Sequence, residues 1–177
     1  MEKYILTGGP CTGKTTLLKR LEEEGYAIIE EVPRQIIHEE LEKQKLNPDY
    51  TPIVPWLDLL KFNKLLIKRQ SSLESLVEAE KVFLDRSLVD PLAYAKLGNI
   101  DLGNEIQGYI RKAAYTKAFF LEQLNLYIKD DERKESEEEG KKLHQAIYEA
   151  YRDSGIETIV VPAVSVEERL RIVLASI

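Results

Sequence analysis

The chain has 177 residues, of which 25 are lysine or arginine and 31 are aspartate or glutamate, so its formal net charge is −6. This length predicts a single domain, residues 1–177, that is able to bury an ordinary hydrophobic core. The acidic balance argues against general binding to nucleic acid, and the single cysteine excludes a disulfide framework within the chain. No apolar run is long enough to span a membrane. The N-terminus lacks the pattern of a signal peptide, so we expect a cytoplasmic protein.

A glycine-rich loop follows the first predicted strand, which covers residues 3–7. An apolar run precedes the loop and a helical pattern follows it, which is the context that a phosphate-binding loop needs. The loop fits the pattern G-x-x-x-x-G-K-[ST] and, with the next residue, supplies the predicted phosphate-binding residues Gly8, Gly9, Pro10, Cys11, Thr12, Gly13, Lys14, Thr15 and Thr16. The alternative is a chance glycine turn before a helix. It would make the lysine, the threonine, the preceding apolar run and the following helical pattern coincidences.

Each part of this loop has an expected role in binding a nucleoside triphosphate such as ATP. The glycines allow backbone amides to turn toward one point, and the positive end of the helix dipole adds to their attraction for phosphate. Lys14 is expected to reach the β and γ phosphates and to act in catalysis, and the Thr15 hydroxyl is expected to hold Mg²⁺. Cys11 is interpreted as a small filler side chain.

The second predicted strand, residues 26–30, ends in charged residues. Glu30 and Glu31 are followed by Arg34. Two neighbouring carboxylates raise each other's pKa unless a cation lies between them, and Mg²⁺, Arg34 or Arg86 is a candidate for that cation. Glu31 is the candidate general base for an acceptor hydroxyl or for water, and Arg34 is a candidate for binding phosphate. The alternative is a solvated acidic start to the next helix, which the helix dipole favours.

The third predicted strand, residues 81–85, is an apolar run that ends in Asp85. An aspartate in this place is typical of a Walker B element, whose carboxylate holds Mg²⁺ directly or through water. The alternative is a surface aspartate that caps the next helix. Arg86 is a candidate to bind a phosphate or a substrate oxygen through two guanidinium nitrogens. Its alternative role is a structural ion pair with Glu30 or Glu31.

A long helix is predicted between these two strands, over residues 55–79. Its apolar stripe is interrupted by Asn63 and Gln70. Trp56 and Phe62 are the aromatic residues best placed to form walls of an acceptor pocket, because this helix would flank the strand ends. Packing in the core is the alternative role for these two rings.

A charge-dense segment, residues 129–142, lies between the fourth predicted strand and the helix that carries Leu143 and Ile147. We predict that this segment is a lid that closes over the transferred phosphate and excludes water. Arg133 is its candidate catalytic residue, and Lys134 is a further candidate for binding phosphate. A solvated run of charges is the alternative.

Strands and helices alternate along the chain, which predicts a doubly wound α/β domain with a parallel sheet. The strand candidates are mostly continuous apolar runs, as expected for strands that are buried on both faces. In such sheets, ligands bind at the carboxyl ends of the strands. The remaining predicted elements are strands over residues 118–121 and 158–161, a first helix that stops at Gly25, helices over residues 34–45, 91–97 and 102–114, and a last helix that begins with a capping box of Ser165 and Glu168.

Several of these segments resemble the NadR-type group of predicted AAA ATPases among P-loop kinase-like proteins. The similar segments are residues 6–18, 31–37, 83–90, 130–134 and 161–169, so the resemblance extends over nearly the whole chain. It implies the nucleotide-kinase P-loop fold, with five strands in the order 2-3-1-4-5, helices on both faces and a small lid.

The chain is also similar to deoxynucleoside kinases in having Asp85, Arg86 and Ser87 at the end of the third strand. By this resemblance, Glu31 would act as a base and Asp85 would bind Mg²⁺. Arg86 and Arg133 would hold phosphates.

Three functions remain open. The first is Mg²⁺-dependent and ATP-dependent phosphoryl transfer to a small hydroxyl or phosphate acceptor, such as a nucleoside or a nucleotide. The second is hydrolysis of nucleoside triphosphates or of inorganic tripolyphosphate or polyphosphate. The third is nucleotide-gated binding or regulation. The guanine-selecting motif Asn-Lys-x-Asp is missing after the fourth strand, and the GTPase switch motif Asp-x-x-G is missing after the third. We expect a monomer or a homodimer.

Overall fold

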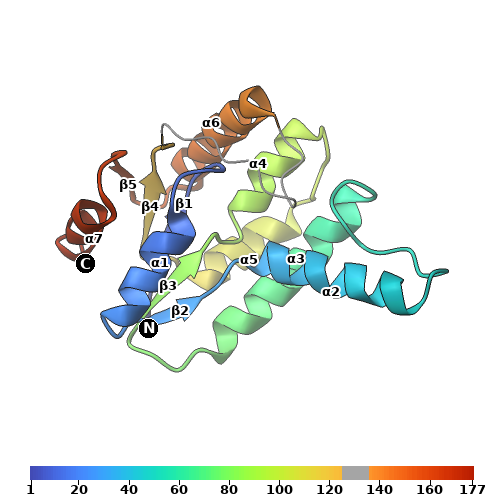
Figure 1. Cartoon of the computed structure of the whole chain (residues 1–177), viewed down its shortest axis with the longest axis horizontal. Coiled ribbons are helices and arrows are strands. Elements are labelled where there is room, and N and C mark those ends of the chain that lie inside the picture. The colour runs from blue at the N-terminus through green and yellow to red at the C-terminus, as the bar shows by residue number, and fades with distance from the viewer. Residues whose placement is uncertain (125–135) are drawn as a thin grey trace.

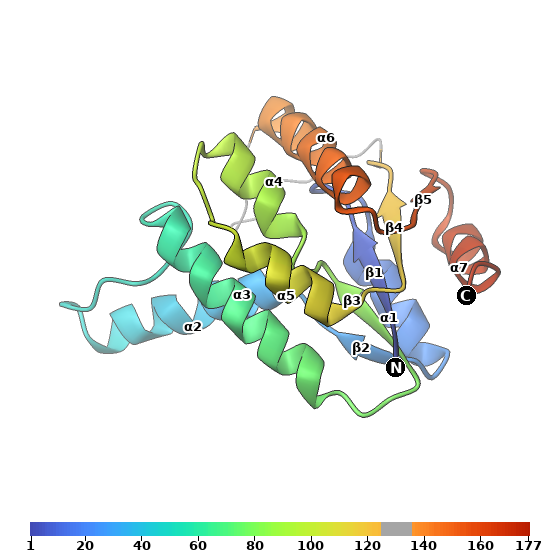
Figure 2. The same ribbon diagram turned by 180° about the vertical axis from the view of Figure 1, so that it is seen from behind.

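A computed structural model describes residues 1–124 and 136–177 of the chain. Its strands form a single parallel sheet in the order β2-β3-β1-β4-β5, with helices on both faces (Figures 1 and 2). The strands are β1 (Glu2–Thr7), β2 (Ala27–Ile29), β3 (Lys81–Asp85), β4 (Lys117–Leu121) and β5 (Thr158–Val161). The predicted fold class and the strand order implied by the resemblance are both confirmed.

The helices fall into two layers. α1 (Lys14–Glu23) and α7 (Val166–Leu174) cover one face of the sheet, and α3 (Leu59–Leu76), α4 (Asp90–Leu97), α5 (Glu105–Ala113) and α6 (Glu137–Ser154) cover the other (Figures 1 and 2). α2 (Val32–Leu46) packs beside α3 and, with the connection that follows it, projects away from the sheet. None of the helices in the described parts of the chain is long and apolar enough to cross a membrane.

The central strand β1 shows why the strands are continuous apolar runs. Successive side chains of a strand point to opposite faces of the sheet. Tyr4 and Leu6 therefore belong to the core beneath α1 and α7, whereas Ile5 belongs to the core beneath α4, α5 and α6. All three side chains are buried. Alternation of polar and apolar residues would place polar groups in one of these two cores without partners.

Several predicted boundaries differ from the structure by one to four residues, and two of these differences bear on the site. The second strand is shorter than predicted, so Glu30 and Glu31 belong to the turn before α2. The long helix begins at Leu59 instead of residue 55, because Asp58 caps it: its Oδ1 accepts a hydrogen bond from the backbone N–H of Lys61 at 2.9 Å. The capping box predicted for α7 is present, with both of its reciprocal hydrogen bonds.

Candidate active site

The loop between β1 and α1 contains two positions that require glycine. Gly8 has φ +134°, and a Cβ there would lie 2.7 Å from the carbonyl oxygen of Leu121 on β4. At Gly9, a Cβ would lie 2.8 Å from Cβ of His144 on α6. The loop is thus held closely between β4 and α6, while residues 10–16 line a large cavity.

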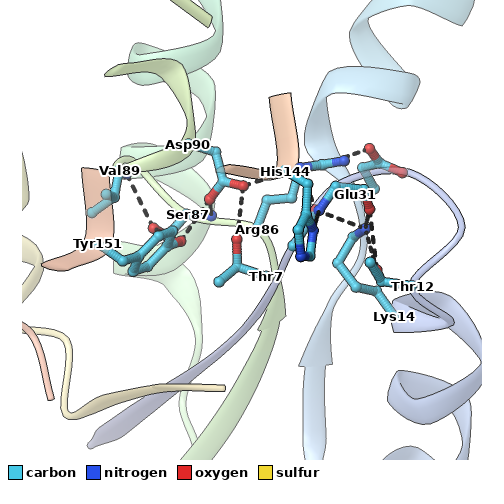
Figure 3. Close-up of polar contacts among 12 residues, drawn as sticks. Thr7, Thr12, Lys14, Glu31, Arg86, Ser87, Val89, Asp90, His144 and Tyr151 are labelled. Carbon is cyan, nitrogen blue, oxygen red and sulfur yellow. Dashed lines mark hydrogen bonds and ion pairs between the residues drawn. The ribbon is translucent and has the colours of Figure 1, made fainter. Parts of the chain in front are cut away.

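Lys14, the first residue of α1, turns its ammonium group back onto the loop (Figure 3). Its Nζ donates hydrogen bonds to the carbonyl oxygens of Gly8 and Gly9, at 3.1 and 2.9 Å, and to Oγ1 of Thr12 at 3.1 Å. Burial and the neighbouring guanidinium of Arg86 lower the pKa of Lys14 from 10.5 to about 8. An anionic phosphate placed beside this ammonium group would raise the pKa again.

Thr15 and Asp85 lie together beside the loop, in the positions predicted for a metal site. The Thr15 hydroxyl donates to Oδ2 of Asp85 at 3.3 Å. The other oxygen, Oδ1, is buried and has no hydrogen-bond partner among the described residues, and burial raises the pKa of Asp85. A hydroxyl and a desolvated carboxylate fit Mg²⁺, which takes one or two protein oxygens and completes its shell with phosphate and water. Within residues 1–124 and 136–177, no cluster of three His, Cys, Asp or Glu suits a metal held by protein alone.

Glu31, at the N-cap position of α2, lies between two arginines. Its Oε1 accepts a hydrogen bond from Nε of Arg86 at 2.9 Å, and its Oε2 pairs with Nε of Arg34 at 2.8 Å. Burial by itself raises the pKa of Glu31, but the charges of Arg86, Lys14 and Arg34 outweigh it and lower the pKa to about 2. Glu30 is exposed. Glu31 is therefore the carboxylate of the Glu30 and Glu31 pair that lies in the cavity, and the two arginines are the cations in direct contact with it.

Arg86 has φ +70°, in the left-handed region that residues with a Cβ seldom adopt. Such a conformation costs about 1–3 kcal/mol and persists where the surroundings hold it. Here its guanidinium donates to Glu31 and, through Nη1, to Oδ1 of Asp90 at 3.0 Å (Figure 3). The structural ion pair with Glu31 is thus present, and binding of phosphate by Arg86 stays a prediction.

Asp90 anchors a buried hydrogen-bond network that no motif in the sequence indicates (Figure 3). Its carboxylate accepts from Oγ1 of Thr7 at 3.0 Å, from Oη of Tyr151 at 2.6 Å and from the backbone N–H of Ser87 at 3.0 Å. The network ties β1, the start of α4 and α6 together next to Arg86. In the sequence, Asp90 is an aspartate at the start of a helix. An ordinary N-cap residue has the same pattern, so the sequence does not distinguish the two roles.

His144 on α6 is a second contact residue that no motif in the sequence indicates. Its Nδ1 accepts a hydrogen bond from the backbone N–H of Gly9 at 3.0 Å, and its ring packs on Phe120 with centroids 4.5 Å apart. Burial and the charge of Lys14 lower the pKa of His144 from 6.5 to about 4. The imidazole is therefore neutral at pH 7, as its role as hydrogen-bond acceptor requires. Since Tyr151 lies on the same helix, α6 contacts both the loop and the Asp90 network.

Replacing His144 with phenylalanine is expected to lower the free energy of unfolding by about 1–3 kcal/mol, because the N–H of Gly9 loses its acceptor while the ring contact remains. His144→Asn is the matched control, since its amide oxygen can take the place of Nδ1. Urea denaturation of the two variants without nucleotide measures the difference. Equal stability of the two would show that the hydrogen bond contributes nothing.

Arg169 on α7 also holds the loop. Its buried guanidinium donates through Nε to the carbonyl oxygen of Pro162 at 2.9 Å and through Nη2 to that of Glu122 at 3.1 Å. Its Nη1 donates to the carbonyl oxygen of Thr12 in the loop. The ends of β4 and β5 are thereby fastened to the loop from the α7 side, opposite the contact with His144.

A cavity of about 860 Å³ extends from the loop into the space between α2 and α3. Trp56 and Phe62, the two aromatic residues predicted as pocket walls, both line it. Its other apolar lining residues include Ile37, Leu41, Leu59, Leu66 and Tyr94. The same cavity therefore has a charged end at the loop and a mainly apolar end between the two helices.

The predicted lid, residues 129–142, lies only partly within the described residues. Arg133 and Lys134 are outside them, so their roles stay predictions. The described part of the range, residues 136–142, forms the N-cap and first turns of α6, where Ser136 and Glu139 make a capping box with both hydrogen bonds present.

Residues 3–169 match the protein family described as AAA domain. The chain belongs to this family. The strand, glycine loop and helix at the site, with the strand order of the sheet, place it in the P-loop kinase-like group of NTPases. No curated protein matches the chain.

Solved structures have the same fold at low sequence identity. The YorR protein from Bacillus subtilis, in complex with phosphorylated GDP, has a TM-score of 0.62 at 19% identity, over 98% of this chain and 94% of YorR. Thymidylate kinase from Candida albicans has a TM-score of 0.67 at 17% identity, over 99% of this chain and 90% of the kinase. NadR protein in complex with NR has a TM-score of 0.63 at 19% identity, over 90% of this chain but only 43% of NadR.

Proposed function

We propose that this protein is a Mg²⁺-dependent and ATP-dependent phosphotransferase that acts on a small acceptor such as a nucleoside or a nucleotide. The observation that carries the proposal is the continuous cavity of about 860 Å³ that joins the phosphate-binding loop to an apolar space between α2 and α3. A hydrolase needs room only for water beside the terminal phosphate. A cavity of this volume, with aromatic side chains at its far end, suits an organic acceptor.

The phosphate end of the cavity supplies what in-line phosphoryl transfer needs. The loop amides and Lys14 would hold the phosphates, and Thr15 with Asp85 would hold Mg²⁺. Bound Mg²⁺ would offset the negative charge of the phosphates. Arg86, beside Glu31, would approach the transferred group. Transfer of this kind depends on positioning and on fixed charges more than on covalent chemistry, and buried, hydrogen-bonded groups such as these provide both.

Glu31 would orient the acceptor hydroxyl. Its pKa of about 2 keeps it ionised at neutral pH but makes it a weak base. A loose, metaphosphate-like transition state leaves the proton on the acceptor oxygen until late, so a strong base is not required. A hydrogen bond from the hydroxyl to Glu31 would direct an oxygen lone pair toward the phosphate.

Related folds bind ligands of the proposed kind. The YorR structure holds phosphorylated GDP, and structures of NadR hold NAD with AMP-PNP or hold NR. Two thymidylate kinases share the fold. At these identities the likeness concerns the fold, and it supports a nucleotide at the loop more strongly than it supports any particular acceptor.

Phosphate release or transfer should be measured with Mg²⁺ and each of ATP, GTP, the dNTPs, pyrophosphate and inorganic tripolyphosphate, with and without a mixture of nucleosides and nucleotides. We expect turnover of ATP that the acceptor mixture raises by about 10-fold or more, since water is a poor substitute for a positioned hydroxyl. Chelation of Mg²⁺ by EDTA is the control.

Two results would overturn the proposal. Fast release without acceptor, above all from tripolyphosphate, would identify a phosphohydrolase. Tight nucleotide binding with negligible turnover under every condition would identify a nucleotide-gated binding protein.

A further inference from the structure

A buried carboxylate lies on α2, away from the charged end of the cavity. Glu40 is only 2% exposed, although a carboxylate is costly to bury unless it is paired and hydrogen-bonded. Burial by itself raises the pKa of this carboxyl group, but hydrogen bonds from Lys43, Tyr50 and the backbone of Ile53 outweigh it and lower the pKa. The carboxylate is therefore ionised at neutral pH, and its partners show which part of the chain it holds.

Two of these partners belong to the connection between α2 and α3, residues 47–58 (Figures 1 and 2). Oε2 of Glu40 accepts a hydrogen bond from Oη of Tyr50 at 2.6 Å and another from the backbone N–H of Ile53 at 2.8 Å. Oε1 pairs with Nζ of Lys43, on α2 itself, at 2.5 Å. One oxygen of Glu40 thus fastens the connection to α2, and the other is occupied within the helix.

The fastened part of the connection leads directly into the cavity wall. Val54 follows it and is fully buried. The carbonyl oxygen of Val54 accepts hydrogen bonds from the backbone N–H groups of Leu57 and Asp58, each at 3.1 Å. The turn closed in this way carries Pro55 and Trp56, which both line the cavity. The aromatic wall therefore begins immediately after the segment that Glu40 holds.

Glu40 acts on the end of the cavity that lies away from the phosphate-binding loop. Ile37 of α2 lines this end together with Trp56, whereas the carboxylate of Glu40 contacts the connection. The loop is held by other contacts, from His144 on α6 and Arg169 on α7. Loss of the Glu40 contacts should therefore change the apolar end of the cavity and leave the loop in place.

We propose that Glu40 is a positioning residue, which fastens the α2–α3 connection so that Pro55 and Trp56 form a fixed wall for the acceptor. The link to the acceptor rests on the proposed function, whereas the position of the wall is measurable without it. A wall that is ordered before binding spares the acceptor the entropy cost of ordering it. Loosening the connection therefore weakens binding of the acceptor and has little effect on ATP.

The test compares Glu40→Met and Glu40→Gln with wild type. Methionine keeps the length of the side chain but is a weak acceptor, whereas the amide oxygen of glutamine can take the place of Oε2 and keep both hydrogen bonds to the connection. Glu39→Gln is the matched control, because Glu39 is the adjacent residue of α2 and pairs with Arg69 on α3.

Kinetics are measured with Mg²⁺, ATP and the nucleoside or nucleotide that supports the fastest turnover. We expect Glu40→Met to raise the KM for this acceptor about 10-fold and to change the KM for ATP by less than about twofold. Glu40→Gln and Glu39→Gln should keep both KM values near those of wild type. This rescue by glutamine separates the hydrogen bonds to the connection from the charge of Glu40.

Fluorescence reports on the wall directly, because Trp56 is the single tryptophan of the chain. Acrylamide quenching is measured without ligands, at a temperature at which circular dichroism shows each variant to be folded. We expect the quenching constant of Glu40→Met to be about twofold higher than that of wild type, because local opening exposes the ring. Tyr50→Phe removes only one of the two hydrogen bonds, so it should shift both readouts in the same direction, and it replaces Glu40→Met if that variant does not fold.

Three outcomes would count against the inference. An unchanged acceptor KM in folded Glu40→Met would overturn it, whether or not the quenching changes, because Glu40 would then serve the fold alone. Equal damage by Glu40→Gln and Glu40→Met would assign the effect to the charge and its pair with Lys43, which also overturns it. If no acceptor supports turnover, the phosphotransferase proposal fails, and the quenching comparison decides by itself whether Glu40 holds the wall: an unchanged quenching constant would overturn that claim.

Discussion

Alanine in place of Lys14 is expected to lower kcat for ATP turnover by about 100-fold to 1,000-fold, which is the usual cost of removing one preorganised group that stabilises charge in a transition state. The ammonium group of Lys14 already lies within hydrogen-bond distance of three loop oxygens. A phosphate bound in the loop would compete with these neutral oxygens for the charged ammonium group. Steady-state kinetics with saturating Mg²⁺ and ATP measure the effect.

Lys19→Ala is the matched control, because Lys19 lies on the same helix α1 but is exposed to solvent. It should behave as wild type. If Lys14→Ala retained activity within about tenfold of wild type, the loop would not be the catalytic phosphate site that its sequence indicates.

The lowered pKa of Lys14 makes the same substitution testable by pH. In the free protein this pKa is about 8, so the ammonium form is lost as the pH rises from 7 to 9. ATP binding requires the charged form, and the Kd for ATP should therefore rise about tenfold per pH unit above the pKa. Lys14→Ala should bind ATP more weakly than wild type, and its Kd for ATP should not rise with pH in this range. A slope that persists in the variant would assign the pH dependence to another group.

The fold was predictable because its signals are local. The alternation of apolar runs and helical patterns identifies the elements. The glycine motif of residues 8–15 identifies the first strand, the loop and the first helix. Boundaries were less predictable when they depended on one side chain. Asp58 caps α3 and so excludes residues 55–57 from the helix, although the apolar pattern continues through them.

The candidate site was predictable where a residue belongs to the glycine loop, ends a strand or lies on the helix that flanks the strand ends. Asp85 is the last residue of β3 and Glu31 comes shortly after β2, and parallel strands bring their carboxyl ends to one edge. His144, Tyr151 and Arg169 lie within helices far along the chain. Nothing in the local pattern separates a histidine that accepts a hydrogen bond from the loop from one on an ordinary helix surface, because the contact exists only after α6 has packed.

The partners of a buried charge were equally hard to predict from the sequence, as the network around Asp90 shows. From the sequence, Arg86 had two candidate partners, Glu30 and Glu31, and the structure adds Asp90, four residues further on. The choice between the glutamates depends on the turn before α2, which leaves Glu30 exposed. The short second strand thus determines which carboxylate reaches the cavity.

Asparagine in place of Asp85 is expected to lower kcat about 100-fold and to weaken the apparent affinity for Mg²⁺ by about 10-fold or more, because the amide keeps the shape of the carboxylate but not its charge. The same change should not lower the stability of the protein without ligands. Burial raises the pKa of Asp85, so its ionised form is unfavourable in the folded state at neutral pH. An uncharged amide removes this cost and can still accept the hydrogen bond from Thr15.

The stability effect of Asp85→Asn depends on pH. Because the folded pKa of Asp85 is higher than the unfolded one, wild type loses stability as the pH rises from the unfolded pKa through the folded pKa, and Asp85→Asn does not share this loss. The Tm of the variant should therefore exceed that of wild type at pH 7, and the difference should shrink toward pH 4. Asp49→Asn, at an exposed position, is the control. An unchanged Mg²⁺ titration together with a lower Tm would return Asp85 to a structural role at the start of the turn after β3.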